Sequence, residues 1–232
     1  MLVIHGDNIV QSRLKLTDTI KQKTTPELRV VRLEGPTLTR AQLESHLAAK
    51  SLFGEAKLVV LENLLTLPRS KKKEELIALI SAAQADPELT QQLITWDGKT
   101  VTAPTLKKFS GAQILEFKTS PVVFKWLDSL NGRQLQISQQ IKLLRQAVQS
   151  DGAELCLALL ARQIKLLIQT LENQPLAAPP FVIKKLRQQA ASFNLSQLLA
   201  IHQQLIQIDR EIKSSQLRLS LDKKLDLLIL KM

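Results

Sequence analysis

Short apolar runs alternate with amphipathic stretches through the first 120 residues, and this alternation constrains the fold more than any other feature of the sequence. The apolar runs have the length of buried strands and lie at residues 2–5, 29–33, 57–61, 91–96 and 113–117. The stretches between them have helical spacing, at residues 8–23, 40–50, 71–84 and 105–109. Strand–helix alternation of this kind predicts a parallel sheet covered by helices.

The apolar spacing changes after Pro121. Leucines then recur at helical intervals through long segments without proline, which is typical of an all-helical bundle. The later helices are expected at residues 181–193, 195–213 and 217–230. Thr39 with Gln42 forms an expected capping box, and Asn194 is an expected N-cap. The sequence therefore predicts two domains, residues 1–120 and residues 121–232.

The chain is basic, with a net charge of +11 over 232 residues. Residues 1–120 carry 17 Lys/Arg against 13 Asp/Glu, and residues 121–232 carry 15 against 8. This excess indicates a polyanionic partner such as nucleic acid or an acidic protein surface, although a solvated surface explains it as well. The charge alone leaves both interpretations open.

Cysteine usage and the first residues indicate the compartment. Cys156 is the only cysteine, so the chain can form no internal disulfide, which fits a reducing cytoplasm. Met1 leads directly into the apolar run at residues 2–4, which is typical of a first strand and not of a signal peptide. No apolar run has the length of a membrane span. We expect a cytoplasmic protein with no membrane partner.

The sequence lacks motifs for catalysis. The turn His5-Gly6-Asp7-Asn8 follows the first strand, where a phosphate-binding loop would lie, but it lacks the Gly-Lys-Ser/Thr of that loop. Glu62 stands alone after the third strand, where nucleotide hydrolysis uses an acidic pair. Cys156 lies in a leucine-rich stretch and is expected to be buried and inert. We expect no catalytic residue, no metal ion and no cofactor.

The motif Ser51-Leu52-Phe53-Gly54 lies between the helix expected at residues 40–50 and the strand at residues 57–61. Because Leu52 and Phe53 are adjacent, they cannot both point into one narrow core stripe of a helix. Two interpretations follow. Phe53 packs the helix end onto the sheet, or the pair inserts into a hydrophobic pocket of a partner.

Several segments resemble the delta subunit of the bacterial DNA polymerase III clamp loader. Residues 51–63 resemble the part of that family that contacts the sliding clamp. Segments of the second half resemble its collar helices, at residues 159–167, 180–186, 189–193 and 208–213. The order of these segments along almost the whole chain supports the resemblance.

The resemblance implies a fold of the class α/β plus all-α. It consists of an N-terminal AAA+-like parallel sheet domain without a functional phosphate loop, followed by a C-terminal helical collar bundle. Because residues 123–130 resemble the start of the collar and follow the fifth strand almost at once, the lid domain of this family is expected to be reduced or missing.

The resemblance also implies partners. Ser51, Leu52 and Phe53 would bind the sliding clamp, and the collar would join other clamp-loader subunits in a hetero-oligomer. DNA would be a partner in the assembled complex. That complex is a DNA-directed DNA polymerase, but no catalytic activity is expected of this chain itself.

A basic run opens the helix expected at residues 71–84. Lys71, Lys72 and Lys73 form a candidate DNA-side cluster, or simply a solvated helix start. Three other functions stay open from the sequence. They are a nucleotide hydrolase with a divergent site, a basic helical scaffold that binds nucleic acid, and a helical adaptor unrelated to clamp loading.

Overall fold

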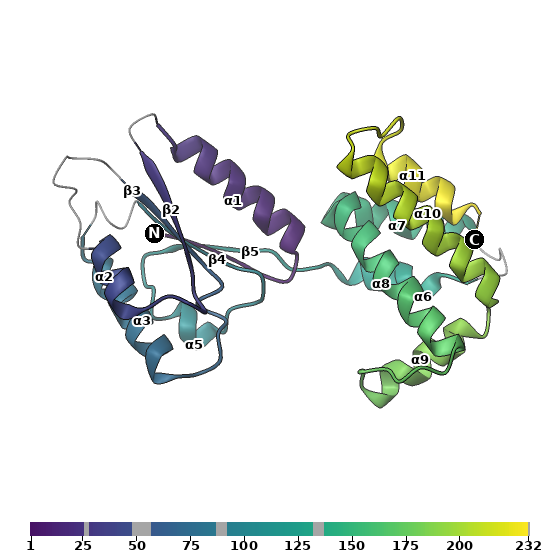
Figure 1. The fold of residues 1–232 in the computed structure, drawn as a ribbon, viewed down its shortest axis with the longest axis horizontal. Helices are drawn as coiled ribbons and strands as arrows, with labels where there is room; N and C mark the ends of the chain where they lie inside the picture. Colours follow the sequence, from purple (N-terminus) through teal and green to yellow (C-terminus); the bar gives the residue numbers. More distant parts are fainter. Residues whose placement is uncertain (26–27, 48–56, 87–91, 132–136, 232) are drawn as a thin grey trace. The chain divides into compact units, whose positions relative to one another are not determined.

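The structure is a computed structural model, which describes residues 1–25, 28–47, 57–86, 92–131 and 137–231. The chain divides into two compact units, Met1–Thr119 and Ser120–Met232 (Figure 1). The first contains the strands, and the second is helical.

A five-stranded sheet organises the first unit. Its strands are β1 (Leu2–His5), β2 (Arg29–Glu34), β3 (Lys57–Glu62), β4 (Leu93–Asp97) and β5 (Gln113–Glu116). All pairings are parallel, and the order across the sheet is β2-β3-β4-β1-β5. Leu2 of β1 pairs with Ile94 on one side and Gln113 on the other. The predicted parallel sheet is confirmed.

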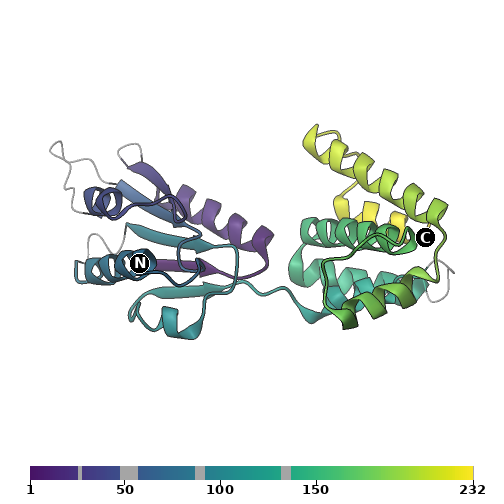
Figure 2. The same cartoon turned by 60° about the horizontal axis from the view of Figure 1, so that its bottom comes forward.

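Helices cover both faces of this sheet (Figure 2). They are α1 (Ile9–Lys23), α2 (Arg40–Leu47), α3 (Lys71–Ala83) and the short α5 (Ala103–Leu106). Because successive strand residues point to opposite faces, the strands supply two cores. Ile4 packs with Leu16 of α1 on one face, whereas Val3 belongs to the core under α2 and α3, with Leu43 and Leu76.

Side-chain caps fix where these helices begin. Asn8 accepts a hydrogen bond from the backbone N–H of Gln11 at 3.1 Å and so caps α1. At α2, the backbone N–H of Thr39 donates to Gln42 Oε1 at 2.9 Å, and the backbone N–H of Gln42 donates to Thr39 Oγ1 at 3.3 Å. This reciprocal pair confirms the capping box predicted from the sequence.

The helices of the second unit pack around one central helix, α8. They are α6 (Pro121–Ser129), α7 (Ile137–Asp151), α8 (Ala153–Leu171), α9 (Pro180–Ala190), α10 (Leu195–Lys213) and α11 (Leu221–Ile229). Helix α8 contacts each of the other five. The core contains Trp126, Leu160 and Leu225, each fully buried. The predicted helical bundle is confirmed, as is the cap at Asn194, which forms a capping box with Gln197.

Three helices differ clearly from their predicted bounds. Helix α9 begins at Pro180 and ends at Ala190, whereas the sequence predicted residues 181–193. Helix α5 begins earlier than expected because Pro104 fits its first turn, and Phe109, which suggested a longer helix, is buried beyond its end. Helix α11 begins at Leu221 instead of residue 217, after the N-cap Ser220. Leu217 packs against the core from the connection before the helix, so its apolar side chain mimics a helical pattern.

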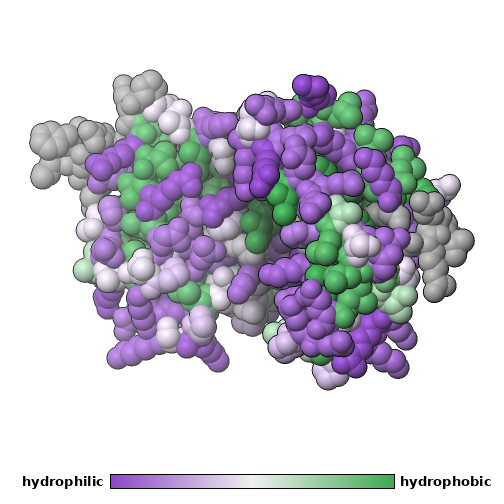
Figure 3. All heavy atoms as spheres, turned by 45° about the vertical axis from the view of Figure 1, so that its right-hand side comes forward, coloured by the Kyte–Doolittle hydropathy of each residue, from purple (hydrophilic) through white to green (hydrophobic). Residues whose placement is uncertain are grey.

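On the face shown in the space-filling view, apolar patches lie among the hydrophilic residues (Figure 3). Large exposed apolar side chains occur in both units, for example Leu14 at 53% and Phe181 at 73% exposure. Among the helices described, none combines the length with the apolar character that crossing a bilayer needs.

Candidate functional site

The predicted clamp-binding residues Ser51, Leu52 and Phe53 lie outside the described residues, so their role stays a prediction. The elements that precede and follow them are described. Helix α2 ends at Leu47, which is buried, and β3 begins at Lys57 and continues into fully buried strand residues. The motif is therefore joined at each end to an element whose apolar side chains lie in the core of the first unit.

The three lysines of the predicted basic cluster have different environments. Lys71 and Lys72 are exposed at the first turn of α3, and Lys72 Nζ donates to the Pro36 carbonyl at 3.2 Å. Lys73 is only 8% exposed, and its Nζ donates to the Leu67 carbonyl at 2.6 Å. Lys73 thus anchors the segment before α3, and Lys71 and Lys72 are the members of the cluster that present charge to solvent.

The turn after β1 is filled by the chain itself. Gly6 has φ +133°, and a Cβ placed there would lie 2.0 Å from the Phe117 carbonyl oxygen. The backbone N–H of Asn8 donates to that same carbonyl at 3.0 Å, and Asp7 Oδ1 accepts from the backbone N–H of Thr119 at 2.7 Å. A phosphate-binding loop needs its backbone N–H groups directed at the ligand. Here the backbone N–H of Asn8 donates to Phe117 and that of Gly6 donates to the Lys99 carbonyl.

The carboxylate of Glu62, at the end of β3, is held by two arginines. Arg13 of α1 donates to Glu62 Oε2 at 2.5 Å, and Arg32 of β2 donates to Oε1 at 2.9 Å. Glu62 is 3% exposed, and the Arg13 guanidinium lies 3.5 Å from the centre of the Trp96 ring. Both carboxylate oxygens are therefore engaged with cations of the protein. No motif in the sequence marks Arg13 or Arg32 as partners of Glu62.

Two further titratable side chains lie buried at the ends of neighbouring strands. Burial raises the pKa of Asp97 to about 6, although hydrogen bonds from Thr66 oppose this shift. Those bonds come from the Thr66 backbone N–H and hydroxyl, each 2.9 Å from Asp97 Oδ1. Burial also lowers the pKa of His5, whose Nδ1 accepts from the Val101 backbone N–H at 3.4 Å. Each group holds a loop segment in place.

The described residues contain no cluster of three or more His, Cys, Asp or Glu side chains suited to a metal ion. Cys156 is buried in the helical unit, as predicted. Burial raises the pKa of its thiol to about 12, so the thiolate that a nucleophile requires is strongly disfavoured.

The chain is similar to known proteins in its sequence and in its structure. The family described as "DNA polymerase III delta subunit, C-terminal domain" matches residues 122–232. No curated protein sequence matches. Among solved structures, the chain is similar to the Bacillus subtilis DNA clamp loader delta protein (YqeN), with 16% sequence identity and a TM-score of 0.45. That alignment covers 99% of this chain and 94% of the other.

The family match covers the helical unit. It begins one residue after the start of α6 and includes every helix from there to α11. The resemblance to the delta subunit that the sequence motifs indicated is confirmed. Residues 122–232, the helical unit, are similar in sequence to the C-terminal domain of DNA polymerase III delta subunits.

Proposed function

We propose that this chain is a delta-like subunit of a replicative clamp loader that binds the sliding clamp and helps to open it for loading onto primed DNA. The observation that carries the proposal is the similarity of residues 122–232 to the C-terminal domain of delta subunits. The covalent order adds support, because a parallel sheet unit precedes this helical unit, as the delta resemblance implies.

The proposed clamp contact is Leu52 with Phe53, preceded by Ser51. Burying each large apolar side chain in a partner's pocket contributes about 1.5–3 kcal/mol, so the pair contributes about 3–6 kcal/mol before ordering costs are subtracted. Two to four decades of affinity correspond to that range. The pair is therefore large enough to dominate a binary complex with the clamp.

The proposed role of the helical unit is assembly. In this role it joins other loader subunits in a hetero-oligomer as the collar, and the assembled complex surrounds DNA. Lys71 and Lys72 are candidate DNA-side residues because they are exposed. The domains proposed are residues 1–120 for the clamp and residues 121–232 for assembly, with the lid of the family reduced or missing. The proposal places the protein in the cytoplasm and requires no cofactor.

The clamp contact can be tested with a double variant and a matched control. Leu52→Ala/Phe53→Ala removes the proposed contact. Leu14→Ala/Phe181→Ala removes the same two side-chain types from exposed positions elsewhere. Binding to the sliding clamp of the same organism is measured by surface plasmon resonance. We expect the first variant to bind about 100-fold more weakly or worse, and the control to match the wild type.

The result that rejects this proposal is equal clamp affinity of the wild type and Leu52→Ala/Phe53→Ala. An absence of clamp binding by the wild type also rejects it. In either case the similarity of residues 122–232 to that domain is unaffected, because it rests on the helical unit alone.

The excess of positive charge in residues 121–232 supports a second candidate, a basic scaffold that binds nucleic acid without the clamp. Such a protein should bind primed DNA with an affinity that falls steeply with salt concentration. Fluorescence anisotropy with labelled primed DNA separates the two functions. The scaffold predicts tight DNA binding that Leu52→Ala/Phe53→Ala leaves unchanged, together with no binding of the clamp.

A further inference from the structure

A groove runs between α10 and α11 in the helical unit. It consists of two adjoining hollows, of about 790 and 310 Å³, that share Gln207, Glu211 and Lys224 as lining residues. The first hollow extends along the connection between the two helices, toward Arg218. The second extends along α11, toward Lys231. Grooves between packed helices are a common site for a helix of another protein.

The second hollow is lined by polar and charged side chains together with four apolar ones. Ile208 and Leu228 form a buried part of its lining, at 7% and 2% exposure. Leu219 and Leu227 also line it but remain 44% and 46% exposed. Two half-exposed leucines beside a buried apolar surface offer a place where a partner's leucine-sized side chain loses contact with water.

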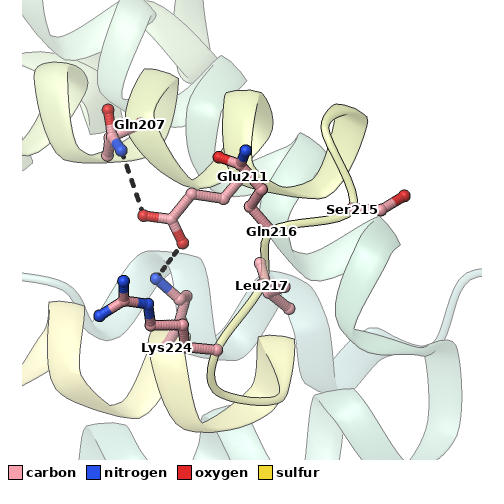
Figure 4. A pocket seen from close by; sticks show the side chains of 7 residues that line it. Gln207, Glu211, Ser215, Gln216, Leu217 and Lys224 are labelled. Carbon is pink, nitrogen blue, oxygen red and sulfur yellow. Dashed lines mark hydrogen bonds and ion pairs between the residues drawn. The ribbon is translucent and has the colours of Figure 1, made fainter.

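The charges of the groove divide into a paired and an unpaired set. Glu211 accepts hydrogen bonds from Lys224 and, at 3.2 Å, from Gln207, and both side chains point toward its carboxylate (Figure 4). These bonds lower the pKa of Glu211. Arg218 borders only the first hollow and Lys231 only the second. Within the described part of the chain neither lies at ion-pair distance from a carboxylate, although the charge of Arg218 also lowers the pKa of Glu211. The groove therefore presents positive charge in both hollows.

This combination favours an acidic protein segment over nucleic acid. The lining residues include no aromatic side chain on which a base could stack. Glu211 would repel a phosphate group placed centrally in the groove. A second copy of this chain is disfavoured as well, because each copy carries a net charge of +11.

From these observations we infer that the groove between α10 and α11 binds an acidic amphipathic helix of another protein. A leucine-sized side chain of that helix packs between Leu219 and Leu227, and carboxylates on its flanks pair with Arg218 and Lys231. This site is separate from the clamp contact at Leu52 and Phe53. Its failure in a test would therefore leave the proposed function untouched.

The test uses a fluorescein-labelled synthetic peptide of leucine and glutamate, with the leucines on one helical face. A scrambled peptide of the same composition, with leucines all around the helix, is the reference, and full-length protein is titrated by fluorescence anisotropy. We expect the patterned peptide to bind and the scrambled one to bind about tenfold more weakly. Leu227→Glu should weaken binding of the patterned peptide about tenfold or more.

Leu199→Glu is the matched control, since Leu199 is 44% exposed on α10 but does not line the groove. It should bind like the wild type. Arg218→Glu should weaken binding at low salt, with a smaller effect at high salt. If Leu227→Glu does not fold, Leu219→Glu in the connection gives the same test.

Three results would each overturn the inference. They are equal binding of the patterned and scrambled peptides, equal binding by Leu227→Glu and wild type, and displacement of the peptide by a single-stranded oligonucleotide in a manner that depends on Arg218. The last result would assign the groove to nucleic acid instead.

Discussion

Asp97 couples the stability of the first unit to pH. Its side chain is fully buried at the end of β4 and holds the Thr66 backbone and hydroxyl. Burial raises its pKa from 3.8 to about 6 in the folded protein. The folded state therefore keeps a proton between about pH 4 and pH 6 that the unfolded state has lost. Its contribution to stability is full below about pH 4 and is lost as the pH rises through about 6.

Asp97→Asn should remove this pH dependence. Asparagine still offers an oxygen to Thr66 but does not titrate. The free energy of unfolding of the wild type, relative to the variant, should fall by about 2 kcal/mol between pH 4 and pH 7, at about 1.36 kcal/mol for each pKa unit. Urea denaturation across this range measures it. The exposed Asp18→Asn should follow the wild type, and parallel curves for Asp97→Asn and wild type would contradict the assignment.

Glu62→Gln tests the shared carboxylate at the end of β3. The change leaves Arg13 and Arg32 side by side without their counter-charge. Removing one member of a buried ion pair is strongly destabilising, but both arginine side chains are partly solvated, so we expect a loss of about 1–2 kcal/mol. The comparison is Glu44→Gln in the exposed pair with Arg40, which should lose clearly less stability because solvent screens that pair. Chemical denaturation that ranks the two variants equally would refute this.

The elements of the fold could be predicted from the sequence more fully than the contacts of single residues. The lone carboxylate Glu62 is evident in the sequence, but its partners lie 49 and 30 positions away, so local spacing carries no trace of them. Strands were predictable because their apolar runs are short and bounded by turn residues. The start of α11 was not predictable. Leu217 contacts the core from the connection before the helix, and in the sequence such a residue looks the same as one within the helix.

At the scale of elements, the turn between β1 and α1 passes close to the chain that follows β5. We therefore expect Gly6 in this turn to tolerate no side chain. Gly6→Ala combines a positive φ with a Cβ placed 2.0 Å from the Phe117 carbonyl oxygen. Gly111→Ala is the matched control, because Gly111 also has a positive φ, +96°, but open space around it. We expect the control to cost about 1 kcal/mol and Gly6→Ala at least about 2 kcal/mol more, measured as the shift in urea midpoint. Equal costs would mean that the turn relaxes freely.

At the scale of the whole molecule, the two units have separate hydrophobic cores. The two clusters beside the sheet draw only on residues 1–119, and the third draws only on residues 120–232. Each unit is long enough to bury a core of its own. Residues 1–119 and 120–232, expressed separately, should each unfold cooperatively, and circular dichroism on heating tests this. A non-cooperative trace from either fragment would show that its core depends on the other.

The hydrogen bonds that tie Asn8 to Phe117 and Asp7 to Thr119 have a consequence for any machine that includes this chain. A nucleotide-driven protein changes conformation at this turn as the nucleotide is bound and hydrolysed. Here the turn is held by hydrogen bonds to Phe117 and Thr119. The grip of this chain on its partners would then stay constant through the cycle. The timing of the cycle would have to come from neighbouring subunits that hydrolyse nucleotide, while the turn in this chain keeps one conformation.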